Sequence, residues 1–143
     1  MCKERNYVIE DEFNYKGFKC LCKFMNGGYR TGYVDIDTSK YPNLDLDTLE
    51  NDMYNTNNSI KEITFSEFIN DNTYRIGFDY AHGNDLFDTV LLSKYFNTDQ
   101  EVIEKIEMLN KLTLIRNPKN HPRTLEDCKN DCMCYCDTLE KIL

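Results

Sequence analysis

The chain has 143 residues, of which 41% are hydrophobic and 13% aromatic, and this suits one domain with its own core. The net charge of −8 argues against direct nucleic-acid binding, which needs a basic face to displace counterions from phosphates. No run approaches the roughly 20 apolar residues that span a membrane, and MCKERNYVIEDEF lacks the apolar core of a secretion signal. The seven cysteines, an odd number, fit reduced thiols, so we expect a cytoplasmic protein that does not bind membranes.

The predicted sheet begins with the strand FNYKGFKCLCKFM, residues 13–25. Its apolar residues Phe18, Cys20, Cys22 and Phe24 alternate with polar ones, as in a strand with one buried face. The tripeptide NGG that follows predicts a hairpin, because Asn and Gly tolerate the positive φ of primed turns.

The returning strand YRTGYVDID has Val34 and Ile36 on one face. Near its start, Tyr29, Arg30 and Tyr33 place a cation beside two aromatic rings. Arginine forks bind phosphates or carboxylates bidentately, and tyrosines stack on bases. These three residues are therefore candidate ligand-binding residues; the alternative is an ordinary hairpin with an exposed arginine.

An acidic segment follows, over residues 35–58, with a loop broken by Pro42 and one short helical turn around 46–53. It carries six acids against the single cation Lys40, a charge of −5. Its acids are Asp35, Asp37, Asp45, Asp47, Glu50 and Asp52. The segment is either a solvated loop or a partner-binding surface that competes with nucleic acid for a basic protein groove.

Two further strands are predicted, over SIKEITFSEF and TYRIGFDYA. The second of them ends in Asp79, His82, Asp85 and Asp88, where a carboxylate could orient the histidine as a general base or several could hold a hard cation. Neither spacing matches a specific motif, and no nucleophile or phosphate-loop motif accompanies them. We therefore predict no catalytic residue, metal or cofactor. Asp79, His82 and Asp85 are instead candidates for a ligand pocket, joined by Arg30 if the two strands are neighbours.

After residue 88 the pattern becomes helical. Thr98 with Glu101 predicts a capping box, as does Thr124 with Asp127. The first helix then repeats apolar residues at helical spacing: Val102, Ile103, Ile106, Leu109 and Leu112. RNPKNHP separates the two helices.

The C-terminal helix contains CKNDCMCYC, with cysteines 128, 132, 134 and 136. Cys128, Cys132 and Cys136 continue an apolar stripe, whereas Cys134 points away from it by about 160–200°. This favours a buried helix face over a zinc site, with metal binding and redox switching left open. Cys20 and Cys22 are likewise expected in the core.

These elements predict a single α+β domain over residues 1–143. Its antiparallel sheet has about four strands, within residues 7–80, and packs on one face against two C-terminal helices, at about 98–115 and 124–142.

YKGFKC, GYRTGYV and GFDYAHGND together resemble an uncharacterised family of tailed phages and prophages that carries the motif G-F-D-x-A-H-x-x-D. The resemblance covers most of the chain in order. Matching positions are Gly32, Tyr33, Pro42, Gly77, Phe78, Asp79, Ala81, His82 and Asp85. The chain departs from the family at Tyr41, where the family has histidine, at IKEITFSE in place of a His-Gly-Gly segment, and at Tyr74 and Arg75 in place of tryptophans. The resemblance implies a phage context and a shared fold, but no reaction.

Two function hypotheses follow. The first is a non-enzymatic phage or prophage accessory protein that inhibits a host defence system, in the manner of an anti-CRISPR, by binding a basic nuclease or effector through the acidic segment. The second is a binder or sponge of a small nucleotide immune signal, or less simply its hydrolase. A homodimer is left open, and the phage context places either protein in the host cytoplasm.

Overall fold

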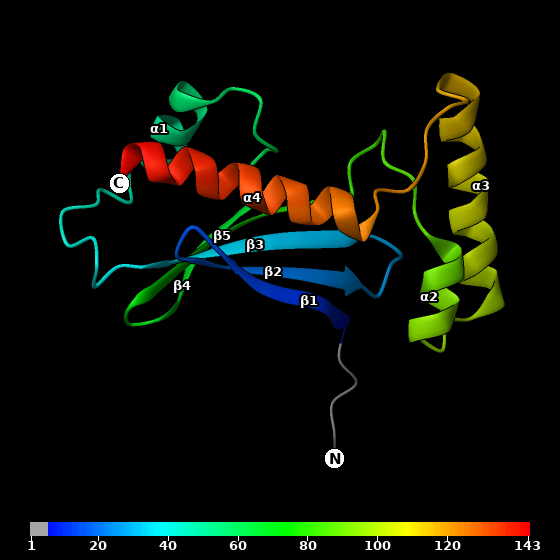
Figure 1. The fold of residues 1–143 in the computed structure, drawn as a ribbon. Coiled ribbons are helices and arrows are strands. Elements are labelled where there is room, and N and C mark those ends of the chain that lie inside the picture. Colours follow the sequence, from blue (N-terminus) through cyan, green and yellow to red (C-terminus); the bar gives the residue numbers. More distant parts are fainter. Residues whose placement is uncertain (1–5) are drawn as a thin grey trace, which may run out of the picture.

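In the computed structural model, which describes residues 6–143, a five-stranded antiparallel sheet is accompanied by four helices (Figure 1). The elements in chain order are β1 (Tyr7–Tyr15), β2 (Phe18–Met25), β3 (Arg30–Asp37), α1 (Leu49–Thr56), β4 (Phe65–Asn70), β5 (Thr73–Asp79), α2 (Thr89–Tyr95), α3 (Gln100–Arg116) and α4 (Leu125–Ile142). The α+β class is confirmed, with five strands where about four were expected.

The additional strand is β1. The single strand predicted over residues 13–25 is wrong, because Lys16 and Gly17, with φ of 51° and 84°, form a tight turn between β1 and β2. A β-bulge between Ile9 and Asp11 interrupts the pairing of β1 with β2. The bulge interrupts the alternation of apolar and polar residues along β1. The sequence therefore lacks the regular period-2 pattern that would have predicted this strand.

The strand order is β1-β2-β3-β5-β4, with all neighbours antiparallel. The hairpin predicted at NGG joins β2 to β3. As expected, Val34 and Ile36 of β3 lie on one buried face, and Ile76 and Phe78 of β5 share that face. The strand predicted over residues 59–68 begins later, since β4 starts at Phe65.

Helix α4 covers this apolar face (Figure 1). Its capping box is confirmed: Thr124 Oγ1 accepts from Asp127 N–H at 3.1 Å, and the Asp127 carboxylate accepts from Thr124 N–H at 2.9 Å. The predicted cysteine stripe is buried against the sheet, and α1 packs on α4 through Leu49 and Met53. The apolar face of α4 thus packs on the apolar face of the sheet, and this contact holds the helical layer on the sheet.

Helices α2 and α3 lie beside the end of the sheet rather than on its face (Figure 1). A second small core joins them to β2 through Phe24, Leu92 and Ile103. The capping box predicted at Thr98 and Glu101 is wrong: α3 is N-capped by Asp99, with no side-chain hydrogen bond to the cap. Of the two C-terminal helices, only α4 therefore covers the sheet.

Candidate functional site

The loop between β5 and α2, residues 80–88 and here called the motif loop, is held by the carboxylates of Asp79 and Asp85. Asp79 accepts hydrogen bonds from the Thr64 hydroxyl at 2.8 Å and from the Ala81 N–H at 3.0 Å. Asp85 accepts from the N–H of His82 at 2.9 Å. Both carboxylates thus hold the backbone where the chain leaves β5. This structural role explains the spacing of the two acids, and no catalytic role is needed to explain it.

The His82 imidazole is 43% exposed and faces three acids. Its Nδ1 lies 3.6 Å from oxygens of Asp79 and Asp85, and its Nε2 lies 3.5 Å from Glu62. These separations are longer than hydrogen bonds, so no carboxylate orients the ring as in a general-base pair. The backbone N–H of His82 is held by Asp85, and its ring lines a groove beside α3.

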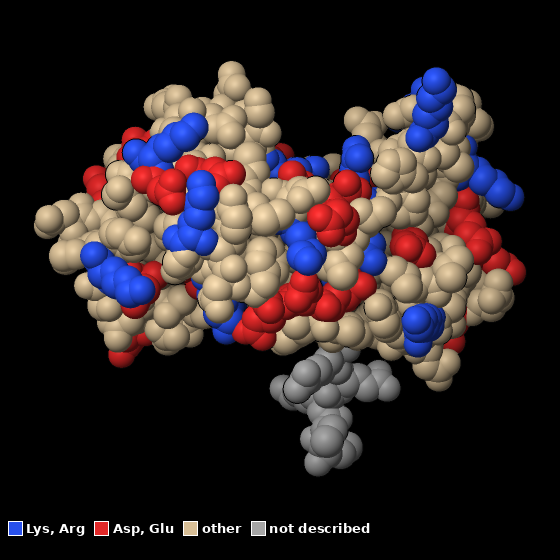
Figure 2. Space-filling model, viewed as in Figure 1, with Lys and Arg blue, Asp and Glu red and all other residues tan. Residues whose placement is uncertain are grey.

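A groove of about 280 Å³ lies between this loop and α3. His82 and Asp85 line it from the loop, and Leu109, Leu112 and Arg116 line it from α3. The two walls are joined because the Asn110 side chain bonds the backbone N–H and C=O of Phe87, at 3.0 and 2.8 Å. Figure 2 shows a hollow between α3 and the rest of the molecule.

Helix α3 also carries an exposed apolar strip, which continues from the groove wall at Leu112. Met108, Leu112 and Ile115 stand at i, i+4 and i+7 and are 66%, 54% and 76% exposed. The helical spacing of this segment was predicted, and two members of that repeat, Leu109 and Leu112, are more than half exposed. Exposed apolar strips of this kind often mark interaction surfaces.

Arg30 is buried within the protein. Its guanidinium donates to both carboxylate oxygens of Glu10, at 2.6 and 3.2 Å, and to the Arg123 carbonyl at 2.7 Å. The ion-paired side chains are only 7% and 6% exposed. The arginine fork is thus already filled by groups of the chain itself.

Arg30 does not converge with the other predicted ligand residues. Strands β3 and β5 are neighbours as expected, with Thr31 opposite Asp79. Since successive side chains alternate between faces, Arg30 and Asp79 point to opposite sides of the sheet. Tyr33 shares the side of Asp79 and packs against Phe65, with ring centroids 5.5 Å apart. The expectation of one pocket combining Arg30 with Asp79 and His82 is therefore wrong.

Tyr29 packs edge-on against Phe87, with ring centroids 6.2 Å apart, and this joins the hairpin to the motif loop. Burial raises its pKa. With Tyr29 in this contact and Arg30 paired with Glu10, the two hairpin residues assigned to a nucleotide are engaged within the protein.

The predicted partner-binding acids are divided. Asp35 is 8% exposed, and Arg75 donates to its carboxylate at 2.7 and 3.0 Å, so it does not contribute to the surface. Glu50 is half-buried and accepts from Ser66 at 2.9 Å. The remaining acids belong to the segment that runs from the end of β3 into α1, at one end of the molecule in Figure 1 and here called the acidic end: Asp37, Asp45, Asp47 and the half-buried Asp52.

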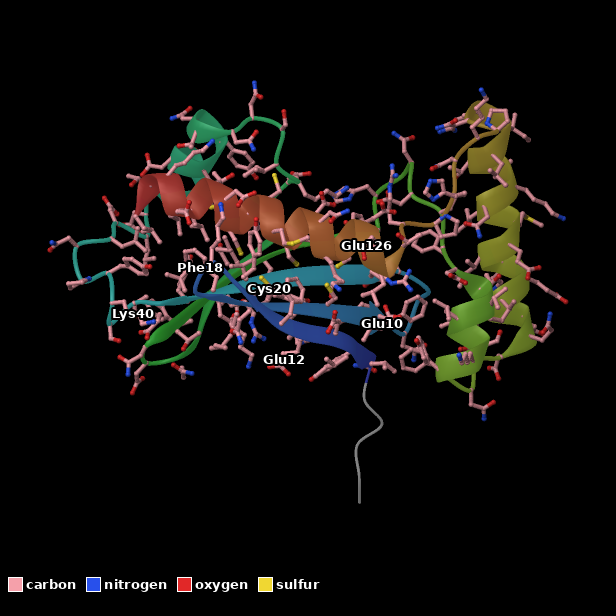
Figure 3. The ribbon with its side chains drawn as sticks, in the orientation of Figure 1. Glu10, Glu12, Phe18, Cys20, Lys40 and Glu126 are labelled. Atoms are coloured by element: carbon pink, nitrogen blue, oxygen red, sulfur yellow. The ribbon has the colours of Figure 1, made fainter. Side chains whose placement is uncertain are left out.

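The acidic end contains an apolar pocket of about 480 Å³. Its apolar walls are formed by Tyr41, Pro42, Leu44, Ile142 and Leu143, and the polar residues Lys40, Asn43, Asp45 and Asp52 complete its lining. Lys40 marks this end in Figure 3, whereas Glu10, the partner of Arg30, lies toward the opposite end of the sheet. Figure 2 shows that acidic side chains also occur across the middle of the molecule, interspersed with Lys and Arg, so the pocket distinguishes this end more than its charge does.

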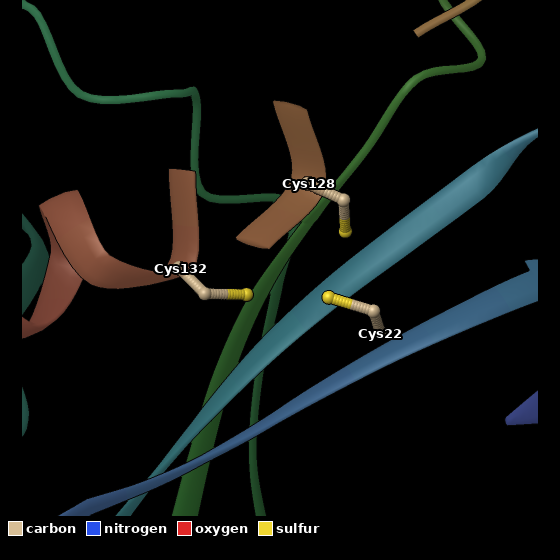
Figure 4. Close-up of side chains that lie close together, drawn as sticks. All are labelled: Cys22, Cys128 and Cys132. Atoms are coloured by element: carbon tan, nitrogen blue, oxygen red, sulfur yellow. The ribbon is translucent and has the colours of Figure 1, made fainter. Parts of the chain in front are cut away.

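The cysteines form a separate feature. Cys22 of β2 meets Cys128 and Cys132 of α4, and the three Sγ atoms lie within 4.8 Å of one another (Figure 4). Hydrogen bonds from the Cys128 and Cys132 thiols lower the pKa of Cys22. Sequence reasoning placed all three in the core but did not bring them together. Two facing stripes, one with period 2 and one with period 4, were the signal that could have found them.

Comparisons with known proteins give no match: no family model, no curated protein and no solved structure resembles this chain significantly. Within residues 6–143, no helix is both long and apolar enough to cross a membrane.

Proposed function

We propose that this protein is a non-enzymatic phage or prophage accessory protein that inhibits a host defence system by binding one of its protein components through the acidic end. The observation that carries the proposal is the pocket with apolar walls that Lys40, Asp45 and Asp52 border. An apolar centre within a charged rim is the usual composition of a protein interface.

The excess of acids at this end favours a basic protein surface as the partner, such as the nucleic-acid groove of a nuclease or effector. Carboxylates on the rim steer a basic partner and fix its register, while the apolar centre supplies most of the affinity. The phage context rests on the family resemblance, and the non-enzymatic character on the loosely held His82 and the absence of nucleophile motifs.

The test uses bacteria that carry a defined nuclease-based defence system, with phage plating efficiency as the readout. Expression of the wild-type chain should restore plating, and the purified chain should bind the nuclease with an affinity that falls as salt rises. Reversing two of the exposed acids, Asp45→Lys with Asp47→Lys, should abolish protection and weaken binding by at least about tenfold.

The matched control is Glu104→Lys with Glu107→Lys on α3, which changes the net charge equally at exposed positions far from the pocket. The control should protect as the wild type does. Equal effects from both pairs, or loss of protection only on α3, would overturn the assignment to the acidic end.

A further inference from the structure

The interface between β2 and α4 is unusually rich in sulfur. Cys20 and Cys22 of β2 face Cys128, Cys132 and Cys136 of α4, and all five side chains are fully buried. They fall into two groups: Cys20 and Cys136, with Sγ atoms 3.4 Å apart, and a cluster of Cys22, Cys128 and Cys132.

The geometry of the three-thiol cluster approaches that of a metal site. Three thiolates, each about 2.3 Å from a shared ion, would lie about 4.0 Å apart in a trigonal plane. In the structure the Sγ atoms of the cluster are already within 4.8 Å of one another, so small side-chain movements would close the site. The Cys128 and Cys132 thiols lie 3.5 and 3.8 Å from the carbonyl oxygens of Thr31 and Tyr33, weak contacts that a metal bond would outweigh.

The ligand set indicates the kind of ion. Three sulfurs favour soft metals over Mg²⁺ or Ca²⁺, which prefer oxygen. Zn²⁺ in structural sites takes four ligands, whereas only three metal-binding side chains meet here among the described residues. Cu⁺ is soft and is suited to three sulfurs in a plane without water.

We propose that Cys22, Cys128 and Cys132 form a site for one soft metal ion, Cu⁺ bound by three sulfurs. The thiols release their protons to solvent as the ion binds, and no oxidation is involved. The site joins β2 to the N-terminal half of α4, so bound metal also stabilises the packing of α4 on the sheet. It is independent of the acidic end.

The experiment titrates the reduced chain anaerobically with Cu⁺ against a colorimetric Cu⁺ chelator. We expect one tightly held ion per chain, an ultraviolet thiolate-to-copper absorption band and a higher melting temperature. Cys128→Ala should weaken the affinity by about 100-fold or more. Cys136→Ala is the matched control, since it is equally buried on the same helix face but outside the cluster, and it should retain binding.

Circular dichroism establishes that each variant is folded, and Cys22→Ala provides a second test should Cys128→Ala unfold. Absence of competitive Cu⁺ binding, or equal losses in Cys128→Ala and Cys136→Ala, would show that the thiols only fill the core. A parallel Zn²⁺ titration checks the metal: cysteine-dependent binding of Zn²⁺ without Cu⁺ binding would overturn the assignment.

Discussion

The buried pair of Glu10 and Arg30 allows the sharpest test of the structure. Replacing Arg30 by Met leaves the Glu10 carboxylate, only 6% exposed, without its cation. Breaking a buried pair from one side costs about 3–5 kcal/mol, because the remaining charge is uncompensated. For a chain of 143 residues, with an unfolding entropy of about 2.1 cal/mol/K per residue, that cost lowers the melting temperature by about 10–17 °C.

The assay is thermal and urea unfolding followed by circular dichroism at neutral pH. Adding Glu10→Gln to Arg30→Met should recover part of the loss, because the buried charge is then gone. Lys129→Met is the control, since its ion pair with Asp11 is about one-third exposed on both sides and should contribute no more than about 1 kcal/mol. If Arg30→Met costs no more than this control, or if the double variant is less stable than the single one, the structural role of Arg30 is refuted.

Two further predictions concern the motif strand and α4. Gly77→Ala should destabilise by about 1–3 kcal/mol, because a Cβ there would lie 2.5 Å from the Tyr33 ring and 2.7 Å from the Gly32 carbonyl oxygen. Urea midpoints measure this, and Gly83→Ala, which meets nothing within 4 Å, should be nearly silent; similar losses would contradict the packing. The backbone N–H of the N-cap residue of α4 lowers the pKa of Asp127, so its stabilisation is present above the ordinary value of about 3.9 and is lost as pH falls. Asp127→Asn should therefore flatten the acid side of the stability–pH curve, and an unchanged acid side would refute the cap.

Sequence patterns correctly predicted those parts of the fold whose signals lie within a few neighbouring residues. The alternation around Val34 and Ile36 identified the buried face of the sheet, and Thr124 with Asp127 marked the start of α4. Cysteine spacing gave the buried face of that helix. Each of these signals is contained within a few residues, so it could be evaluated without knowing what packs against it.

The features that sequence reasoning missed depend on distant partners. Arg30 looked like a free binding residue because Glu10 lies 20 positions away on a bulged strand. The stripe of α3 has the period of a core helix, yet Leu109 and Leu112 stay exposed because α3 packs beside the sheet rather than on it. Periodicity indicates that a face is apolar, and it does not indicate what covers that face.

The G-F-D-x-A-H-x-x-D motif can be explained by folding requirements at most of its positions. Gly77 permits close approach of Tyr33, Phe78 fills the core, and Asp79 and Asp85 hold the backbone of the loop. The His82 ring is different, because its Nδ1 lies 3.6 Å from oxygens of Asp79 and Asp85, too far for a short hydrogen bond. This ring lines the groove beside α3. A chain can therefore need this motif to build the strand exit and still bind a partner of its own elsewhere. The acidic end lies outside residues 77–85, so the partner binding proposed there does not depend on the motif.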